Sequence, residues 1–204
     1  MLEANVRALW DRLVEPVGKA IARHGIAPNA ITLVGAAVQL VVAYEIVSDH
    51  LLAAGLIAVV AAVADAIDGA VAKAAASTTR FGALLDSTLD RLSDALFFGP
   101  VAWLYAVSPG PERAGQRWVA AIALAALVAS FLVSYVKARA EGLGFECNVG
   151  IVARAERTLL MILALVFGLL PVIIPVLAML SIVTILQRVL HVRGQARSAA
   201  SAVR

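Results

Sequence analysis

The chain has 204 residues, of which 62% are hydrophobic and only 15% are charged, and its mean hydropathy is +0.91. These values exclude an ordinary soluble globular domain and predict a protein that lies in a lipid bilayer. The formal net charge of +3 follows from the placement of Lys and Arg in the loops, so it does not indicate nucleic-acid binding. The single cysteine, Cys147, excludes an internal disulfide and a cysteine cluster for metal.

The first 24 residues space apolar side chains at near-helical intervals, with charged residues between them. This pattern predicts an amphipathic helix over 1–24 that lies on the inner membrane surface. Pro28 and Asn29 follow a break in the pattern and are placed to open the first spanning helix.

Six apolar runs follow, each near the roughly 20 residues that a spanning helix requires. They lie at 30–48, 51–67, 83–107, 118–136, 155–170 and 172–190. We therefore expect an all-α integral membrane fold with six transmembrane helices, in a single domain over 1–204. The small and polar residues at 194–204 predict a solvated tail.

The basic residues, Lys and Arg, are concentrated in every second segment outside these runs. Of the 17 basic residues, only Arg113 and Arg117 fall on one side of this alternation. Cytoplasmic loops carry the excess of Lys and Arg. The distribution predicts a multi-pass protein of the cell (inner) membrane, with both termini and the connection after the second span in the cytoplasm.

Four carboxylates interrupt the apolar sequence around that connection. Asp65 and Asp68 are three residues apart, and Asp86 and Asp90 are four apart, so each pair lies on one helix face. A single Asp there could be a helix-end charge in a solvated loop, but four in this pattern are rare in a membrane. Hard divalent cations would neutralise the cluster, and the absence of His and Cys from the segment argues against Zn²⁺. The segment therefore predicts a site for Mg²⁺ or Mn²⁺.

Such a cluster at headgroup depth suits phosphoryl transfer. Two carboxylate-held metals can clamp a diphosphate and leave another carboxylate free to take a proton from an incoming hydroxyl. Gly69, Ala72 and Gly82 keep the neighbouring surface low, so that a ligand can approach the backbone, although small residues singly also serve helix packing.

Written as spacing, the segment is Asp65-x-x-Asp68-Gly69-x-x-Ala72-Lys73, eight residues, then Gly82-x-x-x-Asp86-x-x-x-Asp90. This pattern resembles the signature of the CDP-alcohol phosphatidyltransferases, membrane enzymes with six spans. The sequence departs from it at Lys73, where the family usually has Arg. Lys keeps the positive charge but cannot donate the paired hydrogen bonds of a guanidinium.

The resemblance implies two Mg²⁺ or Mn²⁺ ions, a general base, a CDP-lipid donor and a homodimer. The metal ligands would be Asp65, Asp68, Asp86 and Asp90, with Asp90 also the general base. The CDP-lipid site would include Asn29, Gly69, Ala72, Lys73, Thr79 and Gly82.

Basic residues at two later helix ends indicate the acceptor. They are Lys137, Arg139, Arg154 and Arg157, and to these the resemblance adds Arg188. Each alone could be a positive-inside anchor, but together, opposite metal-loaded carboxylates, they favour an anionic, phosphorylated polyol over a neutral or zwitterionic acceptor. Asp94, one turn beyond Asp90, could belong to the pocket or to a helix contact.

The stretches SYVKARAE, RAER and LDSTLDRLSDA, and the QR pair at 187–188, are similar to bacterial phosphatidylinositol-phosphate synthases. The resemblance implies transfer of a phosphatidyl group from CDP-diacylglycerol to inositol 1-phosphate, with release of CMP. Glycerol 3-phosphate remains an alternative acceptor. A cation-coupled transporter is an alternative of another class, and it predicts carboxylates near the bilayer midplane.

Overall fold

The computed structural model describes residues 16, 28–74, 79–107, 113 and 115–202. Every regular element within these residues is a helix, so the expected all-α fold is confirmed for the described part of the chain. The amphipathic helix expected over 1–24 lies outside the described residues apart from Pro16, and it stays a prediction.

In the described part of the chain, six helices of 13 to 33 residues overlap the six apolar runs, although the fifth of them ends at Val166, before the expected 170. They are α2 (Pro28–Val47), α3 (Leu51–Ala74), α4 (Arg80–Val107), α5 (Trp118–Gly142), α6 (Arg154–Val166) and α7 (Leu170–Ala202). By length and composition, α5 and α7 could each cross a membrane, and the apolar parts of α2 and α3 are shorter. Helix α7 continues well past 190, so the tail expected at 194–204 is helical to Ala202 and mostly exposed.

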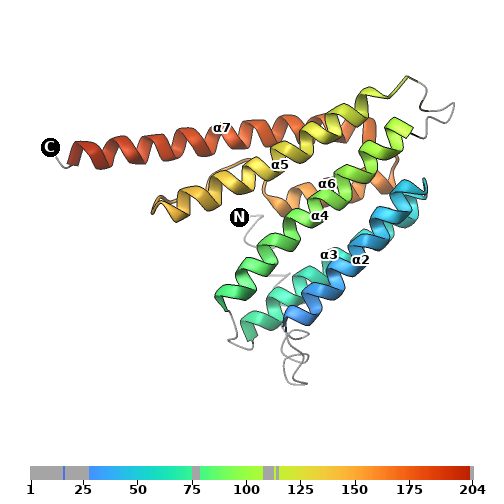
Figure 1. Cartoon of the computed structure of the whole chain (residues 1–204), viewed down its shortest axis with the longest axis horizontal. Coiled ribbons are helices and arrows are strands. Elements are labelled where there is room, and N and C mark those ends of the chain that lie inside the picture. Colours follow the sequence, from blue (N-terminus) through green and yellow to red (C-terminus); the bar gives the residue numbers. More distant parts are fainter. Residues whose placement is uncertain (1–15, 17–27, 75–78, 108–112, 114, 203–204) are drawn as a thin grey trace.

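Figure 1 shows α2 and α3 on one side of the molecule, α5 and α7 on the other, and α4 and α6 between them. Helices α2 and α3 form a hairpin around a tight turn at 48–50, in which Asp49 has a positive φ of 65°. Gly55 allows α3 to approach the end of α6, because a Cβ at this position would lie 2.6 Å from a methyl carbon of Val166. This close approach brings α3, α4 and α6 around one pocket.

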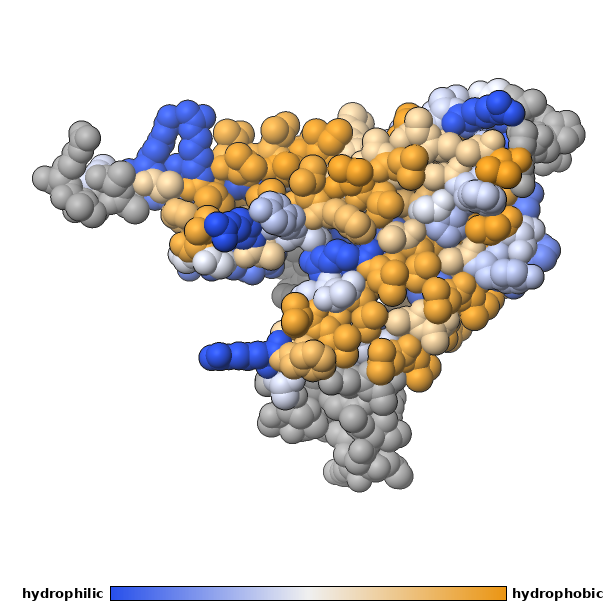
Figure 2. All heavy atoms as spheres, viewed as in Figure 1, coloured by the Kyte–Doolittle hydropathy of each residue, from blue (hydrophilic) through white to orange (hydrophobic). Residues whose placement is uncertain are grey.

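The interior is formed by large side chains from several helices, among them Ile46, Phe98, Leu104 and Met161, each at most 1% exposed. The outward faces are apolar as well, and Figure 2 shows hydrophobic side chains over long stretches of the visible surface. A surface of this extent is costly in water and suits contact with hydrocarbon. The helices are therefore apolar on both their inner and their outer faces.

Candidate active site

Three of the four predicted carboxylate ligands meet between α3 and α4, at the level where the apolar part of α3 ends. Asp65 on α3 and Asp86 and Asp90 on α4 each offer an oxygen, and these oxygens all lie within 4.8 Å of one another. Only five residues separate the end of α3 from the start of α4. Asp68 lies on α3 one turn further along, and its side chain is outside the described part of the structure.

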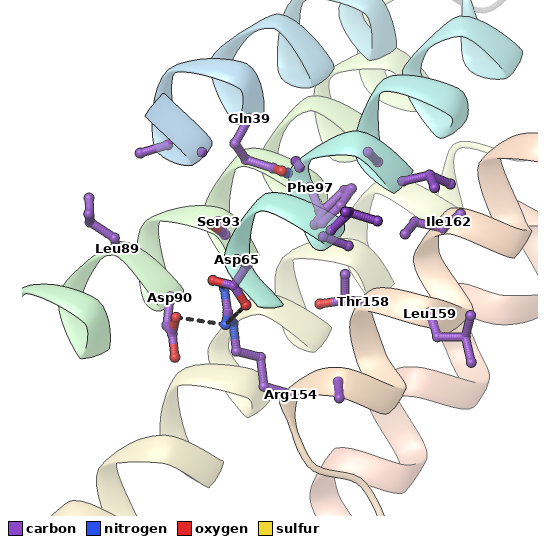
Figure 3. Close-up of a pocket in the computed structure, with 18 of the residues that line it drawn as sticks. Gln39, Asp65, Leu89, Asp90, Ser93, Phe97, Arg154, Thr158, Leu159 and Ile162 are labelled. Carbon is purple, nitrogen blue, oxygen red and sulfur yellow. Dashed lines mark hydrogen bonds and ion pairs between the residues drawn. The ribbon is translucent and has the colours of Figure 1, made fainter. Parts of the chain in front are cut away.

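Arg154, the first residue of α6, lies directly against this cluster. Its Nη1 donates to Asp65 Oδ2 at 2.7 Å and lies 2.9 Å from Asp90 Oδ1, while Nη2 donates to Asp65 Oδ1 at 3.2 Å (Figure 3). The guanidinium thus balances part of the negative charge of the cluster. Sequence reasoning placed Arg154 opposite the carboxylates and assigned it to the acceptor phosphate, but it did not predict this direct ion pair.

Arg157 is three residues further along α6, and it lies in the interior. Its Nη2 donates to Asp94 Oδ2 at 2.9 Å, and the Ser130 hydroxyl donates to the same oxygen. Arg157 is only 3% exposed and Asp94 only 5%. Asp94 therefore makes a helix contact between α4, α5 and α6, and Arg157 does not line the pocket beside the carboxylates.

Arg188 on α7 holds the connection at 143–153, which leads into α6. Its guanidinium donates to the carbonyl oxygens of Val149, at 2.9 Å, and Val133. Neighbouring side chains on α7 accept backbone N–H groups of the same connection, Thr184 from Val152 at 3.2 Å and Gln187 from Ile151 at 3.1 Å. Arg188 is thereby placed to fix the start of α6 and, with it, Arg154.

The last two predicted acceptor residues lie near the C-terminal end of α5. Lys137 Nζ is 3.7 Å from Glu141 Oε1, one turn away, and Arg139 is exposed. Both cations can therefore meet a soluble ligand at this end of the molecule without first breaking a buried contact.

Thr79 and Gly82 form the start of α4. The Gly82 amide donates to Thr79 Oγ1 at 2.9 Å, which is the geometry of a helix N-cap. Asn29 lies in the first turn of α2, and Gly69, Ala72 and Lys73 lie in the last turns of α3; their side chains are outside the described part. The structure thus gives Thr79 a structural role, and the CDP-lipid roles of all six residues stay predictions.

A pocket of about 640 Å³ opens between α2, α3, α4 and α6. Asp65, Asp90 and Arg154 form its polar end, and Ala, Val, Leu, Ile and Phe side chains make up most of the remaining wall (Figure 3). The polar residues Thr32, Gln39, Ser93 and Thr158 also line it, and sequence reasoning missed all four. Gln39 left a signal, because it is a lone amide in an apolar run.

At the opposite end of α3 from the carboxylate cluster, Asp49 and Arg113 form another aspartate–arginine ion pair. Arg113 Nη1 donates to Asp49 Oδ2 at 2.7 Å, and Nη2 donates to Oδ1. The hydrogen bonds that Arg113 donates to Asp49 raise the pKa of Arg113 above its ordinary value. This pair is remote from the carboxylate cluster, and it provides a control for the predictions below.

The fold, the acidic cluster and the apolar pocket agree with the family that the motif resembled. The model of the CDP-alcohol phosphatidyltransferase family matches residues 25–190, and the chain belongs to this family. Its members are integral membrane proteins. A transferase family does not support the transporter alternative.

Two relatives and two solved structures sharpen this assignment. The chain is 35% identical over 187 residues to archaetidylinositol phosphate synthase of Pyrococcus horikoshii, covering 91% of this chain and 94% of the relative. It is 39% identical over 166 residues to phosphatidylinositol phosphate synthase of Corynebacterium glutamicum, covering 81% and 74%.

The solved structures are of Mycobacterium tuberculosis phosphatidylinositol phosphate synthase, each 29% identical to this chain. The complex with CDP-DAG has a TM-score of 0.79 and covers 89% of this chain and 94% of that one. The complex with manganese and citrate has a TM-score of 0.78 and covers 88% of both chains.

Proposed function

We propose that the protein transfers the phosphatidyl group of CDP-diacylglycerol to a hydroxyl of inositol 1-phosphate, giving phosphatidylinositol phosphate and CMP. The observation that carries this proposal is the meeting of Asp65, Asp86 and Asp90 at the polar end of an apolar pocket. Such a site can hold a diphosphate at its entrance and lipid further in. The phosphatidylinositol phosphate synthases among the relatives support the choice of substrates.

The cluster suits two Mg²⁺ or Mn²⁺ ions, bound by Asp65, Asp68, Asp86 and Asp90. The donor set fits, because it consists of carboxylate oxygens, which hard divalent cations prefer. The manganese complex of the mycobacterial neighbour supports the same assignment. When bound, the ions would hold the diphosphate and stabilise charge on the departing CMP.

In this proposal Asp90 is the general base. It takes the proton of the attacking inositol hydroxyl as that oxygen forms a bond to the phosphorus of the phosphatidyl group. The bond between this phosphorus and the oxygen of CMP breaks, and CMP leaves with that oxygen. Asp90 suits this role because it is only partly exposed and lies among the other carboxylates, where the diphosphate would bind.

The phosphate of the acceptor would be held by Arg154, Lys137 and Arg139. Arg154 is half-buried at the pocket, and its guanidinium can form two hydrogen bonds to a phosphate. The buried contacts of Arg157 and Arg188 support a different role for these two residues, in which they position α6 and the connection before it. The nucleotide would lie by Asn29, Gly69, Ala72, Lys73, Thr79 and Gly82.

We further propose that all six helices cross the cell (inner) membrane in one domain, with both termini and the active site in the cytoplasm. The length of α5 and α7, the apolar outer surface and the alternation of Lys and Arg support this topology. The N-terminal helix would lie on the inner surface, and the protein would form a homodimer.

The acceptor is tested with purified protein, CDP-diacylglycerol and Mg²⁺ or Mn²⁺. Inositol 1-phosphate, glycerol 3-phosphate and free inositol are supplied in turn, and CMP release is measured. We expect release with inositol 1-phosphate and little with the other two. Release with glycerol 3-phosphate and not with inositol phosphate would assign the protein to phosphatidylglycerophosphate synthesis.

A further inference from the structure

The pocket contains a polar group that the proposed reaction does not use. Gln39 on α2 is 4% exposed and lines the pocket, and its Nε2 has no hydrogen-bond partner among the described residues. Figure 3 shows the side chain pointing into the pocket, toward Phe97. A buried amide donor without a partner is destabilising, so this position favours a ligand that can accept its hydrogen bond.

The depth of Gln39 in the pocket limits what that ligand can be. Phe97 follows Asp90 by seven residues on α4, which corresponds to about 10 Å along a helix. On α3, Ala58 precedes Asp65 by seven residues and also lines the pocket. The Gln39 amide thus lies two helical turns inside the carboxylates, where most of the surrounding wall is apolar.

We propose that the Gln39 amide donates a hydrogen bond to an ester carbonyl of the donor lipid and thereby selects diacyl over dialkyl donors. This inference rests on the proposed function. With the diphosphate at the carboxylates, the glycerol esters extend roughly 8 Å further at bond lengths of about 1.5 Å, close to the depth of Gln39. Beyond the phosphate, the ester oxygens are the acceptors in a diacylglycerol, because the hydrocarbon chains have none.

The ester carbonyl distinguishes the two kinds of donor. An ether-linked donor has the same chains but no carbonyl, and its ether oxygen is a weaker acceptor that lies within the chain. The amide of Gln39 would stay unpaired with that donor, which is how a buried polar group rejects a ligand without the matching atom. Gln39 is therefore a specificity-determining residue for the linkage of the lipid.

The test compares CDP-diacylglycerol with CDP-dialkylglycerol of the same chain length, in wild-type protein and in Gln39→Leu. CMP release with inositol 1-phosphate gives kcat/KM for each donor. Leu is apolar and similar in size, so the fold should be retained. Gln116→Leu makes the same chemical change in the connection before α5, outside the pocket, and is the matched control.

We expect wild-type protein and Gln116→Leu to prefer the diacyl donor. Gln39→Leu should lose about five- to tenfold in kcat/KM for this donor, mainly through KM, and keep its value for the dialkyl donor. Equal losses for both donors, or no loss, in a wild-type enzyme that releases CMP would overturn the inference and leave the proposed function intact. No CMP release from wild-type protein with any phosphorylated acceptor would overturn both.

Discussion

Two aspartate–arginine pairs join α4 to α6, and they differ mainly in depth. Asp90 and Arg154 are 2.9 Å apart at the pocket, with 19% and 31% of their side chains exposed. Asp94 and Arg157 are also 2.9 Å apart, with 8% and 3% of their side chains exposed. The same two residue types at the same distance therefore form one pair open to a ligand and one closed to it.

The neighbours of each pair explain the difference. Ser130 donates to Asp94, so the deeper carboxylate is held by two partners inside the protein. The outer pair has Asp65 and Asp86 beside it, and Arg91 Nη1 lies 3.6 Å from Asp90 Oδ2, which leaves three carboxylates against the two guanidinium groups of Arg154 and Arg91. The buried pair of Asp94 and Arg157 thus stabilises the contact between α4 and α6. The outer pair of Asp90 and Arg154 leaves unbalanced negative charge that a cation can neutralise.

The largest effect should come from removing the open carboxylate. We expect Asp90→Asn to lower kcat by about 10²–10⁴-fold, because the general base and a metal ligand are lost together. The midpoint of thermal unfolding in detergent should change little. Asp49→Asn, which alters a carboxylate paired with Arg113 at the far end of α3, is the control and should keep the activity of wild-type protein.

Changing the closed pair, Asp94 and Arg157, should lower the free energy of unfolding. Arg157→Met leaves Asp94 buried with only Ser130 as partner, and the expected loss is about 3–5 kcal/mol in the free energy of unfolding. Combining it with Asp94→Leu should recover most of this loss, because a buried pair replaced by apolar residues no longer holds an unpaired charge. Denaturant unfolding of the single and double variants measures both. A stable Arg157→Met protein would show that the two pairs do not differ in this way.

Arg154→Gln should affect substrate binding more than stability. A charged hydrogen bond contributes about 1.5–3 kcal/mol, so KM for inositol 1-phosphate should rise about tenfold or more. Mn²⁺ should bind at least as tightly as in wild-type protein, because the guanidinium no longer competes for Asp65 and Asp90. Initial rates over a range of acceptor concentrations check the first expectation, and Mn²⁺ titration checks the second. Weaker Mn²⁺ binding would contradict the competition.

The smallest effect is expected from Thr79→Ala, which removes the N-cap of α4. The loss should be about 1 kcal/mol in the free energy of unfolding. Because the cap is at the start of α4, hydrogen exchange should rise in the first turns, near Asp86, and not around Asp94. Thr79→Ser keeps the hydroxyl and is the control. An equal increase in hydrogen exchange along the whole of α4 would mean that the region near Asp86 and the region around Asp94 do not open independently.

Sequence reasoning located the helices and the carboxylates because both leave local patterns. The six apolar runs are long, and the Asp spacings of three and four require only helix geometry to put each pair on one face. The partners of Arg154 and Arg157 could not be found in this way. They depend on how α6 is placed against α4, where Arg154 at the first position of α6 meets Asp90 and Arg157, about one turn further along, meets the more deeply buried Asp94.

Two further features depend on contacts between segments that are distant in the chain. Arg188 binds backbone carbonyls of Val133 and Val149, which carry no side-chain signal. The extension of α7 to Ala202 was missed because polarity was given more weight than helix propensity, although Ala is the strongest helix former.

The most direct test of the carboxylate cluster as a metal site is Mn²⁺ binding measured by electron paramagnetic resonance. Purified wild-type protein and Asp49→Asn should bind Mn²⁺ with the same affinity. Asp65→Asn and Asp90→Asn should each weaken binding at least tenfold while the proteins remain folded, because a charged ligand is lost from the cluster. Unchanged Mn²⁺ affinity in both variants would contradict the assignment of the carboxylate cluster as the metal site.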